Sequence, residues 1–114
     1  MKLSFVIPVF NEQDSLEKLY FEILENTKKY DYEIIFIDDG SMDESYNILQ
    51  KLAVEDKNVK LIKLRKNFGK SAGLNVGFEV ARGDIVFTMD ADLQDDPKEI
   101  EQFIKKLEEG YDMV

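Results

Sequence analysis

Short runs of apolar residues alternate along the chain with segments in which apolar residues recur every three or four positions. The runs are rich in Val, Ile and Phe and predict strands at 3–9, 32–37, 59–64 and 84–89, with a fifth beginning at 111–114. The periodic segments predict helices that include 16–24, 48–53, 74–81 and 100–107. This alternation is typical of an α/β domain, in which a mostly parallel sheet carries helices on both faces.

Turn and cap residues refine these boundaries. Ser41 and Glu44 have the spacing of a capping box and predict the start of the second helix. Gly83 stands where the third helix should end. Gly73 and Gly77 lie inside that helix, where glycine is unfavourable, and they predict a close approach of the helix to the sheet or to a ligand.

Composition narrows the possible chemistry. The 114 residues include 24 acidic and 15 basic side chains, a net charge of −9, and an acidic surface of this kind repels nucleic acid. The chain has no Cys and no His, which excludes disulfides, thiolate metal sites and His-dependent catalysis and is compatible with a cytoplasmic location. Any metal must be bound by oxygen, which favours Mg²⁺, Mn²⁺ or Ca²⁺. No apolar run reaches the roughly 20 residues of a membrane span.

The sequence stops within the last expected strand, at 111–114. We therefore interpret 1–114 as a single, partial domain that is truncated at its C-terminal side, because this length suits one domain. A partial strand would leave an unpaired sheet edge that could bind a second copy of the chain, so a homo-oligomer is one expected state.

Polar residues follow each expected strand, and ligands of open α/β sheets bind at this edge. Asp90 and Asp92 follow the fourth run, with Gln94 two residues further, and such oxygen ligands suit Mg²⁺ or Mn²⁺. The alternative is a polar turn that caps the next helix. Asp38 and Asp39 follow the second run and could accept hydrogen bonds from a nucleobase or a ribose, or could simply form a strand-to-helix turn.

A basic loop follows the third run. Lys66, Gly69 and Lys70 could meet a phosphate at the start of the next helix, where free N–H groups favour anions, and the alternative is a solvated loop. The chain lacks a complete P-loop and a GxGxxG motif, so neither class of nucleotide site is expected.

Taken together, these motifs resemble those of family-2 glycosyltransferases with the GT-A fold. The matching stretches occur in family order over nearly the whole chain, at 6–12, 37–43, 65–70, 81–84 and 89–95. Segments 67–69 and 92–95 are most similar to the branch that transfers sugars to polyprenyl phosphates, including dolichyl and undecaprenyl phosphate. Asp96 departs from the proline often found at this place in that branch.

The resemblance implies a Rossmann-like nucleotide-sugar-binding domain and a role for each matching residue. The residues expected to bind the donor are Pro8, Phe10, Glu12 and Asp39 around the nucleoside, Asp38 in support, and Lys70 nearby. The residues expected around the metal and the sugar are Asp90, Asp92 and Gln94. Asp90 would contact the sugar or a metal-bound water, and Asp92 and Gln94 would ligate Mg²⁺ or Mn²⁺. Asp90 and Asp92 are therefore the expected catalytic residues.

The implied activity is that of an inverting hexosyltransferase, which moves a sugar from a UDP- or GDP-linked donor to a polyprenyl phosphate. A lipid phosphate is already anionic near neutral pH and needs no general base, which fits a chain without His. The acceptor site and any membrane helices would lie after residue 114. The full-length protein would then act at the cytoplasmic face of a membrane, and the 114-residue chain alone would be inactive.

Other interpretations stay open from the sequence alone. A saccharide hydroxyl could replace the lipid phosphate as acceptor. A phosphohydrolase of the haloacid dehalogenase type also uses a DxD motif, but there the motif follows the first strand rather than the fourth. A receiver-like signalling domain or a non-catalytic nucleotide-sugar-binding module would share the acidic edge.

Overall fold

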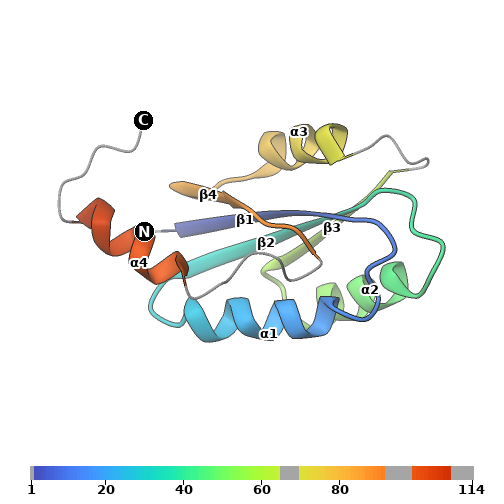
Figure 1. Cartoon of the computed structure of the whole chain (residues 1–114), viewed down its shortest axis with the longest axis horizontal. Helices are drawn as coiled ribbons and strands as arrows, with labels where there is room; N and C mark the ends of the chain where they lie inside the picture. The colour runs from blue at the N-terminus through green and yellow to red at the C-terminus, as the bar shows by residue number, and fades with distance from the viewer. Residues whose placement is uncertain (1, 65–69, 92–98, 109–114) are drawn as a thin grey trace.

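The computed structural model describes residues 2–64, 70–91 and 99–108. Its strands are β1 (Lys2–Val9), β2 (Asp31–Asp38), β3 (Val59–Lys63) and β4 (Ile85–Thr88). Its helices are α1 (Leu16–Asn26), α2 (Ser45–Glu55), α3 (Lys70–Val80) and α4 (Glu99–Glu108). The strands form one parallel sheet in the order β3-β2-β1-β4 (Figure 1). The predicted α/β class with a parallel sheet is therefore confirmed, while the fifth expected strand lies outside the described residues.

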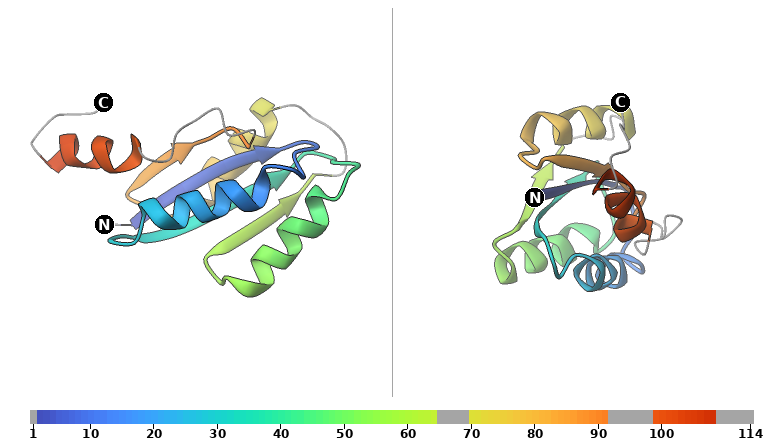
Figure 2. Two further views of the ribbon diagram at one scale, coloured as in Figure 1. Left: turned by 60° about the horizontal axis from the view of Figure 1, so that its bottom comes forward. Right: turned by 90° about the vertical axis from the view of Figure 1, so that its left-hand side faces the viewer.

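Different helices cover the two faces of the sheet. Figure 2 shows α3 on one side and α1 and α2 on the other. Successive residues of β1 point to opposite faces, so Phe5 and Ile7 pack in the core beneath α1, α2 and α4, whereas Val6 packs on the α3 side. The rings of Phe5 and Phe87 stack with their centroids 5.3 Å apart and join β1 to β4. Burial of both faces explains why the strands read as nearly continuous apolar runs.

Two glycines mark close contacts with the sheet. A Cβ at Gly77 would lie 2.2 Å from Val6 Cγ1, so α3 packs this closely only because no side chain is present. The predicted close approach is confirmed at Gly77, whereas a Cβ at Gly73 would meet its nearest neighbour at an ordinary 3.5 Å. The prediction that Gly83 ends this helix is wrong, because α3 ends at Val80, and Gly83 instead lies two residues before β4, against Ser4 of β1.

The predicted capping box is also wrong. α2 begins at Ser45, and the Glu44 side chain caps no backbone N–H of the helix but accepts a hydrogen bond from the Asn47 side-chain amide at 2.8 Å. Asp43 accepts the Ser45 N–H at 2.9 Å through Oδ1 and so satisfies one free donor of the first turn. The Ser41 hydroxyl is engaged elsewhere, because it accepts a hydrogen bond from the Asn11 N–H at 3.0 Å.

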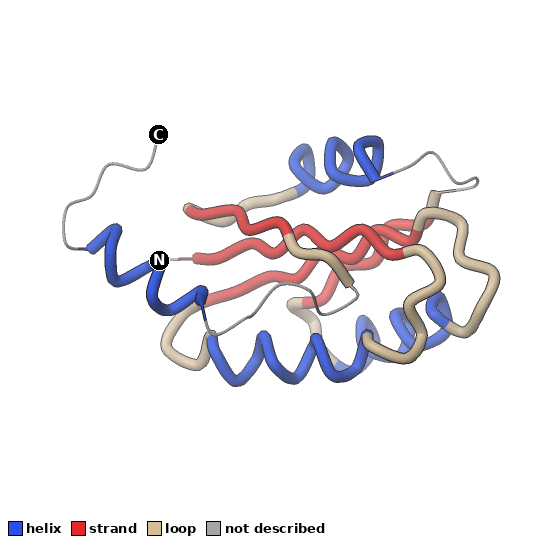
Figure 3. Tube along the Cα trace, in the orientation of Figure 1, coloured by secondary structure: helices blue, strands red, loops and turns tan. Residues whose placement is uncertain are grey.

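The strand order places a crevice beside β1. The chain passes from β1 to β2 and β3 in one direction and then returns to place β4 on the other side of β1. The connections that leave β1 and β4 therefore diverge, and ligands of such sheets bind at the carboxyl edge where this happens. Figure 3 shows the loops after β1 and β2 leaving this edge. Within the described ranges, no helix has the length and apolar character that a membrane crossing requires.

Candidate functional site

A pocket of about 240 Å³ lies at the carboxyl edge of the sheet. It is formed where β1 ends and by the residues that directly follow β2 and β4. Its lining residues are Pro8, Val9, Phe10, Glu12, Asp39, Asp90 and Ala91. The pocket thus combines an aromatic ring with carboxylates, which can pack against a planar group and accept its hydrogen bonds.

The two aspartates after β2 are held differently. Asp39 lines the pocket, and its N–H donates to the Val9 carbonyl oxygen at 2.8 Å, which holds it beside the end of β1. Asp38 is fully buried, and its Oδ1 accepts the Ser41 N–H at 3.1 Å. Within the described part of the chain, Asp38 Oδ2 has no hydrogen-bond partner. A buried carboxylate oxygen without a donor is costly, so this atom is an open acceptor next to the pocket-lining Asp39.

The pocket is acidic. Glu12, Asp39 and Asp90 all line it, and none of the lining residues described is basic. Carboxylates gathered in one pocket attract cations, and their oxygen atoms suit hard divalent ions such as Mg²⁺ and Mn²⁺. Among the residues that the structure describes, no group of three or more acidic side chains could hold a metal ion by itself. A metal would need further ligands, and the predicted ligands Asp92 and Gln94 lie outside the described residues.

The structure brings most of the predicted donor residues together. Those that line the pocket are Pro8, Phe10, Glu12, Asp39 and Asp90. Asp38 is buried at the end of β2 and does not line it. Lys70 is the first residue of α3, and its side chain is outside the described part of the chain. The topology thus gathers residues that are far apart in sequence, while their chemical roles stay predictions.

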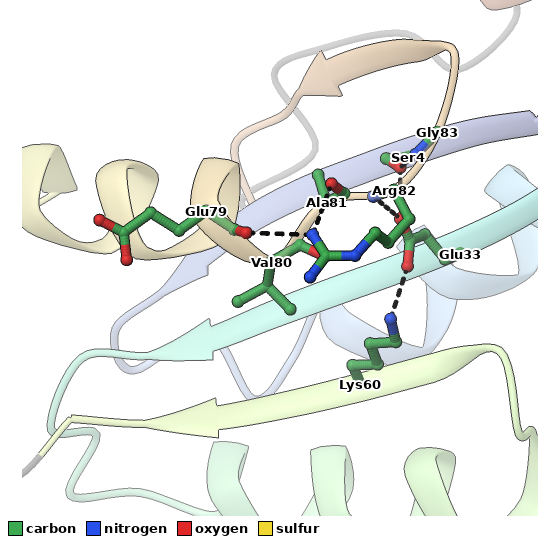
Figure 4. Close-up of polar contacts among 8 residues, drawn as sticks. All are labelled: Ser4, Glu33, Lys60, Glu79, Val80, Ala81, Arg82 and Gly83. Carbon is green, nitrogen blue, oxygen red and sulfur yellow. Dashed lines mark hydrogen bonds and ion pairs between the residues drawn. The ribbon is translucent and has the colours of Figure 1, made fainter.

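A buried polar cluster that the motifs did not predict lies at the opposite, amino edge of the sheet (Figure 4). Glu33 is 2% exposed and accepts hydrogen bonds from the Ser4 hydroxyl, the Lys60 ammonium at 2.8 Å and the Arg82 N–H. Burial raises the pKa of Glu33, but these donors outweigh burial and lower the pKa from 4.5 to about 2. Its signal in the sequence is an acidic residue inside an apolar strand.

This cluster explains the 81–84 segment of the sequence motifs. Besides the Arg82 contact, the Gly83 N–H donates to the Ser4 hydroxyl at 2.7 Å. The Asp84 N–H donates to the Lys2 carbonyl oxygen at 2.7 Å, and Asp84 Oδ2 accepts the Lys2 N–H at 2.9 Å. The segment therefore fixes the start of β4 against β1 and lies at the edge of the sheet away from the pocket.

Comparison with known proteins identifies the family. The sequence model described as glycosyl transferase family 2 matches residues 4–114. The chain belongs to glycosyl transferase family 2. The resemblance seen in the motifs is thereby confirmed, and curated relatives of this family 2 chain are named as transferases.

Curated relatives of this family 2 chain include transferases named for a lipid phosphate. The chain is 46% identical over 115 residues to undecaprenyl-phosphate 4-deoxy-4-formamido-L-arabinose transferase of Pseudomonas fluorescens (strain SBW25), with 98% of the chain and 34% of the relative covered. It is 44% identical over 116 residues to the transferase of the same name in Proteus mirabilis, with 99% and 36% covered. The chain thus spans about a third of the length of these relatives.

Solved structures share the fold. TarS of S. aureus in complex with UDP superposes with a TM-score of 0.73 at 25% identity and covers 96% of this chain and 32% of that one. A mannosyltransferase from Pyrobaculum calidifontis, in complex with GDP-Man and Mn²⁺, gives a TM-score of 0.70 at 24% identity, with 79% and 27% covered. These neighbours are GT-A glycosyltransferases, so the predicted GT-A architecture is confirmed for this part of the domain.

Proposed function

We propose that this chain is the nucleotide-sugar-binding part of an inverting glycosyltransferase that transfers a sugar to a polyprenyl phosphate. The observation that carries the proposal is the acidic pocket at the carboxyl edge, where β1, β2 and β4 contribute adjacent walls. Family membership supports the reaction class, and the names of the relatives support a lipid-phosphate acceptor. Neighbouring structures that hold UDP or GDP-Man support a nucleotide-linked donor.

Different side chains of the pocket would make different contacts with the nucleoside. Phe10 is 43% exposed at the rim of the pocket and offers a ring that can pack against a base or a ribose. Glu12 and Asp39 offer carboxylate oxygens, which accept hydrogen bonds from a base N–H or from ribose hydroxyls. Asp38 supports Asp39 from the buried end of β2. A base that donates N–H groups is favoured over one that presents only acceptors.

The diphosphate poses an electrostatic problem in an acidic pocket. Its charges would be repelled by the acidic residues unless a cation lies between them. Asp92 and Gln94 would hold Mg²⁺ or Mn²⁺, with Asp90 toward the sugar, and this oxygen-only set of side chains matches what a hard divalent ion prefers. When bound, the ion would stabilise the charge of the departing nucleoside diphosphate. Lys70, at the start of α3, would lie near the donor phosphates.

The acceptor and the location complete the proposal. A polyprenyl phosphate carries an anionic oxygen that can attack the sugar directly, so the chain's lack of His is no obstacle. We assign the acceptor site to polypeptide outside this chain and the reaction to the cytoplasmic face of a membrane. The 114-residue chain is then expected to bind the donor without transferring sugar. Sugar transfer by this chain alone would contradict that assignment.

Calorimetric titration tests the donor site directly. The chain is titrated with UDP and with GDP, each with and without Mn²⁺, and the titrations are repeated with Asp39→Asn. We expect one nucleotide to bind, more tightly with Mn²⁺, and the variant to bind it about tenfold more weakly, because a carboxylate acceptor is lost. Asp31→Asn, at the amino edge, is the matched control and should bind like the native chain. A folded chain that binds neither nucleotide would refute the proposal.

A further inference from the structure

We infer that Asn11 is a positioning residue, which locks the loop after β1 onto the loop after β2 so that Glu12 and Asp39 face one pocket. The ligand side of this inference rests on the proposed function. The structural side rests on hydrogen bonds between segments 10–15 and 39–45, which are named the paired loops below. Neither Asn11 nor any partner of Asn11 lines the pocket itself.

Asn11 is attached to the second loop through both its backbone and its side chain. Its N–H donates to the Ser41 hydroxyl at 3.0 Å, and its Oδ1 accepts the Met42 N–H at 2.8 Å. Its φ of 53° lies in the left-handed region, which asparagine adopts more readily than most residues. The residue thus combines a turn in the backbone with an acceptor aimed at the neighbouring loop, and few other side chains provide both.

The neighbours of Asn11 continue the same pairing. The Glu12 N–H donates to the Ser45 hydroxyl at 2.9 Å. The Gln13 N–H donates to Asp43 Oδ2 at 3.3 Å, and Gln13 Oε1 accepts the Glu44 N–H at 2.9 Å. Each of these bonds joins a main-chain N–H of one loop to a side chain of the other. The backbone of Glu12, whose side chain lines the pocket, is therefore fixed relative to the loop that carries Asp39.

A third segment joins the paired loops. The Ser15 hydroxyl, at the start of α1, donates to the Ala91 carbonyl oxygen, one residue after Asp90. The three acidic residues that line the pocket are thus carried by segments that are bonded to one another. Preorganisation of this kind places binding groups before the ligand arrives and so reduces the ordering that binding requires.

The location of the Asn11 hydrogen bonds distinguishes a positioning role from a contribution to the stability of the whole domain. The bonds of Asn11 lie at the exposed edge of the sheet, away from the main core. Loss of a hydrogen bond there should loosen the paired loops while the sheet and its helices stay folded. A purely structural role would instead lower the stability of the whole domain, with no particular effect on the pocket.

The first test measures the loops without any ligand. Amide hydrogen exchange is compared by NMR in the native chain, Asn11→Gly, Asn11→Asp and Ser41→Ala. Glycine keeps the left-handed backbone but removes the acceptor, whereas aspartate keeps an acceptor oxygen. We expect the Met42 amide to exchange at least about fivefold faster in Asn11→Gly and to recover in Asn11→Asp. Unchanged exchange in Asn11→Gly would overturn the inference, whatever the chain binds.

The second test measures nucleotide affinity in the same variants with whichever of UDP or GDP the native chain binds. Asn11→Gly and Ser41→Ala should each weaken nucleotide binding about fivefold or more. The double variant should bind little more weakly than either single variant, because both substitutions disrupt the same pairing of the two loops. Tyr32→Phe is the matched control, since it removes one hydrogen bond, to Asp56, at the amino edge, and should leave affinity unchanged. Loosened loops with native affinity would overturn the inference. A native chain that binds neither nucleotide would refute the proposed function and remove the basis of the inference with it.

Discussion

Replacement of Glu33 by glutamine tests how much a buried charge contributes to this fold. The carboxylate is almost completely buried between β1 and β3 and accepts hydrogen bonds from Ser4, Lys60 and Arg82. Glutamine has the same shape, but it carries no charge and replaces one acceptor oxygen by an N–H₂ group. That group would face donors on either side, so at least one native hydrogen bond is lost whichever way the amide is turned.

The pKa of Glu33 sets the size and the pH dependence of the effect. A pKa lowered from 4.5 to about 2 corresponds to about 3 kcal/mol of unfolding free energy, as an order of magnitude. Because the folded-state pKa lies below that of the unfolded chain, this contribution is complete above about pH 4.5. It is lost progressively as the pH falls toward 2.

Urea unfolding at several pH values measures this contribution. At pH 7 we expect Glu33→Gln to lower the unfolding free energy by about 2–3 kcal/mol, and the difference from the native chain should shrink steadily below pH 4.5. Glu25→Gln is the matched control, because Glu25 also pairs with a lysine, Lys28, at 3.8 Å, but is 73% exposed. It should change stability by less than about 0.5 kcal/mol. A Glu33→Gln effect that is equally large at pH 7 and pH 3 would refute the electrostatic explanation.

Five further substitutions test packing and buried polar groups by the same unfolding measurement. Gly77→Ala should destabilise the domain by about 1–3 kcal/mol because its Cβ would overlap the sheet, whereas Gly73→Ala should be neutral or stabilising, and equal effects would contradict the packing argument. Tyr20→Phe and Tyr32→Phe should each lower the unfolding free energy by about 1 kcal/mol, because both hydroxyls donate to Asp56 Oδ2. Variants as stable as the native chain would show that these hydrogen bonds do not stabilise the fold. Asp38→Asn should leave the free chain as stable as the native chain or about 1 kcal/mol more stable, and it should weaken nucleotide binding. Marked destabilisation by this substitution would show that the buried charge of Asp38 is already compensated in the free chain.

The sequence was most informative where burial imposes a regular pattern. Parallel strands buried on both faces need continuous apolar runs, and helices on a sheet need an apolar stripe, so both kinds of element could be recognised within a few residues. The alternation of strands and helices predicted the fold class but not the order of the strands in the sheet, because periodicity does not say which strands are neighbours. The grouping of Glu12, Asp39 and Asp90 could be predicted because all three follow strands, and parallel strands end at the same edge.

The errors and omissions share a physical cause, which is that hydrogen bonds between distant segments leave no periodic signal. Ser41 has the right spacing for a helix cap, but its hydroxyl pairs with a loop about thirty positions away, and α2 begins later. Gly83 resembles a helix end, yet its lack of a side chain is required by contact with Ser4. Glu33 has apolar neighbours in the sequence, and no residue near it in the sequence indicates that Lys60 lies beside it in the fold.

The buried acidic side chains at the two edges of the sheet differ in whether hydrogen-bond donors surround them, and this contrast bears on function. At the amino edge the protein itself supplies the donors, so Glu33 is compensated and stabilises the fold. At the carboxyl edge, among the described residues, Asp38 Oδ2 is buried without a donor, and the pocket beside it is lined by acids with no base. An uncompensated buried oxygen destabilises the free protein, and a cation bound in the pocket beside Asp38 would offset that cost without touching the carboxylate. Asp38→Asn tests this argument, because it removes the charge that such a cation would compensate and keeps one carbonyl oxygen for the Ser41 N–H.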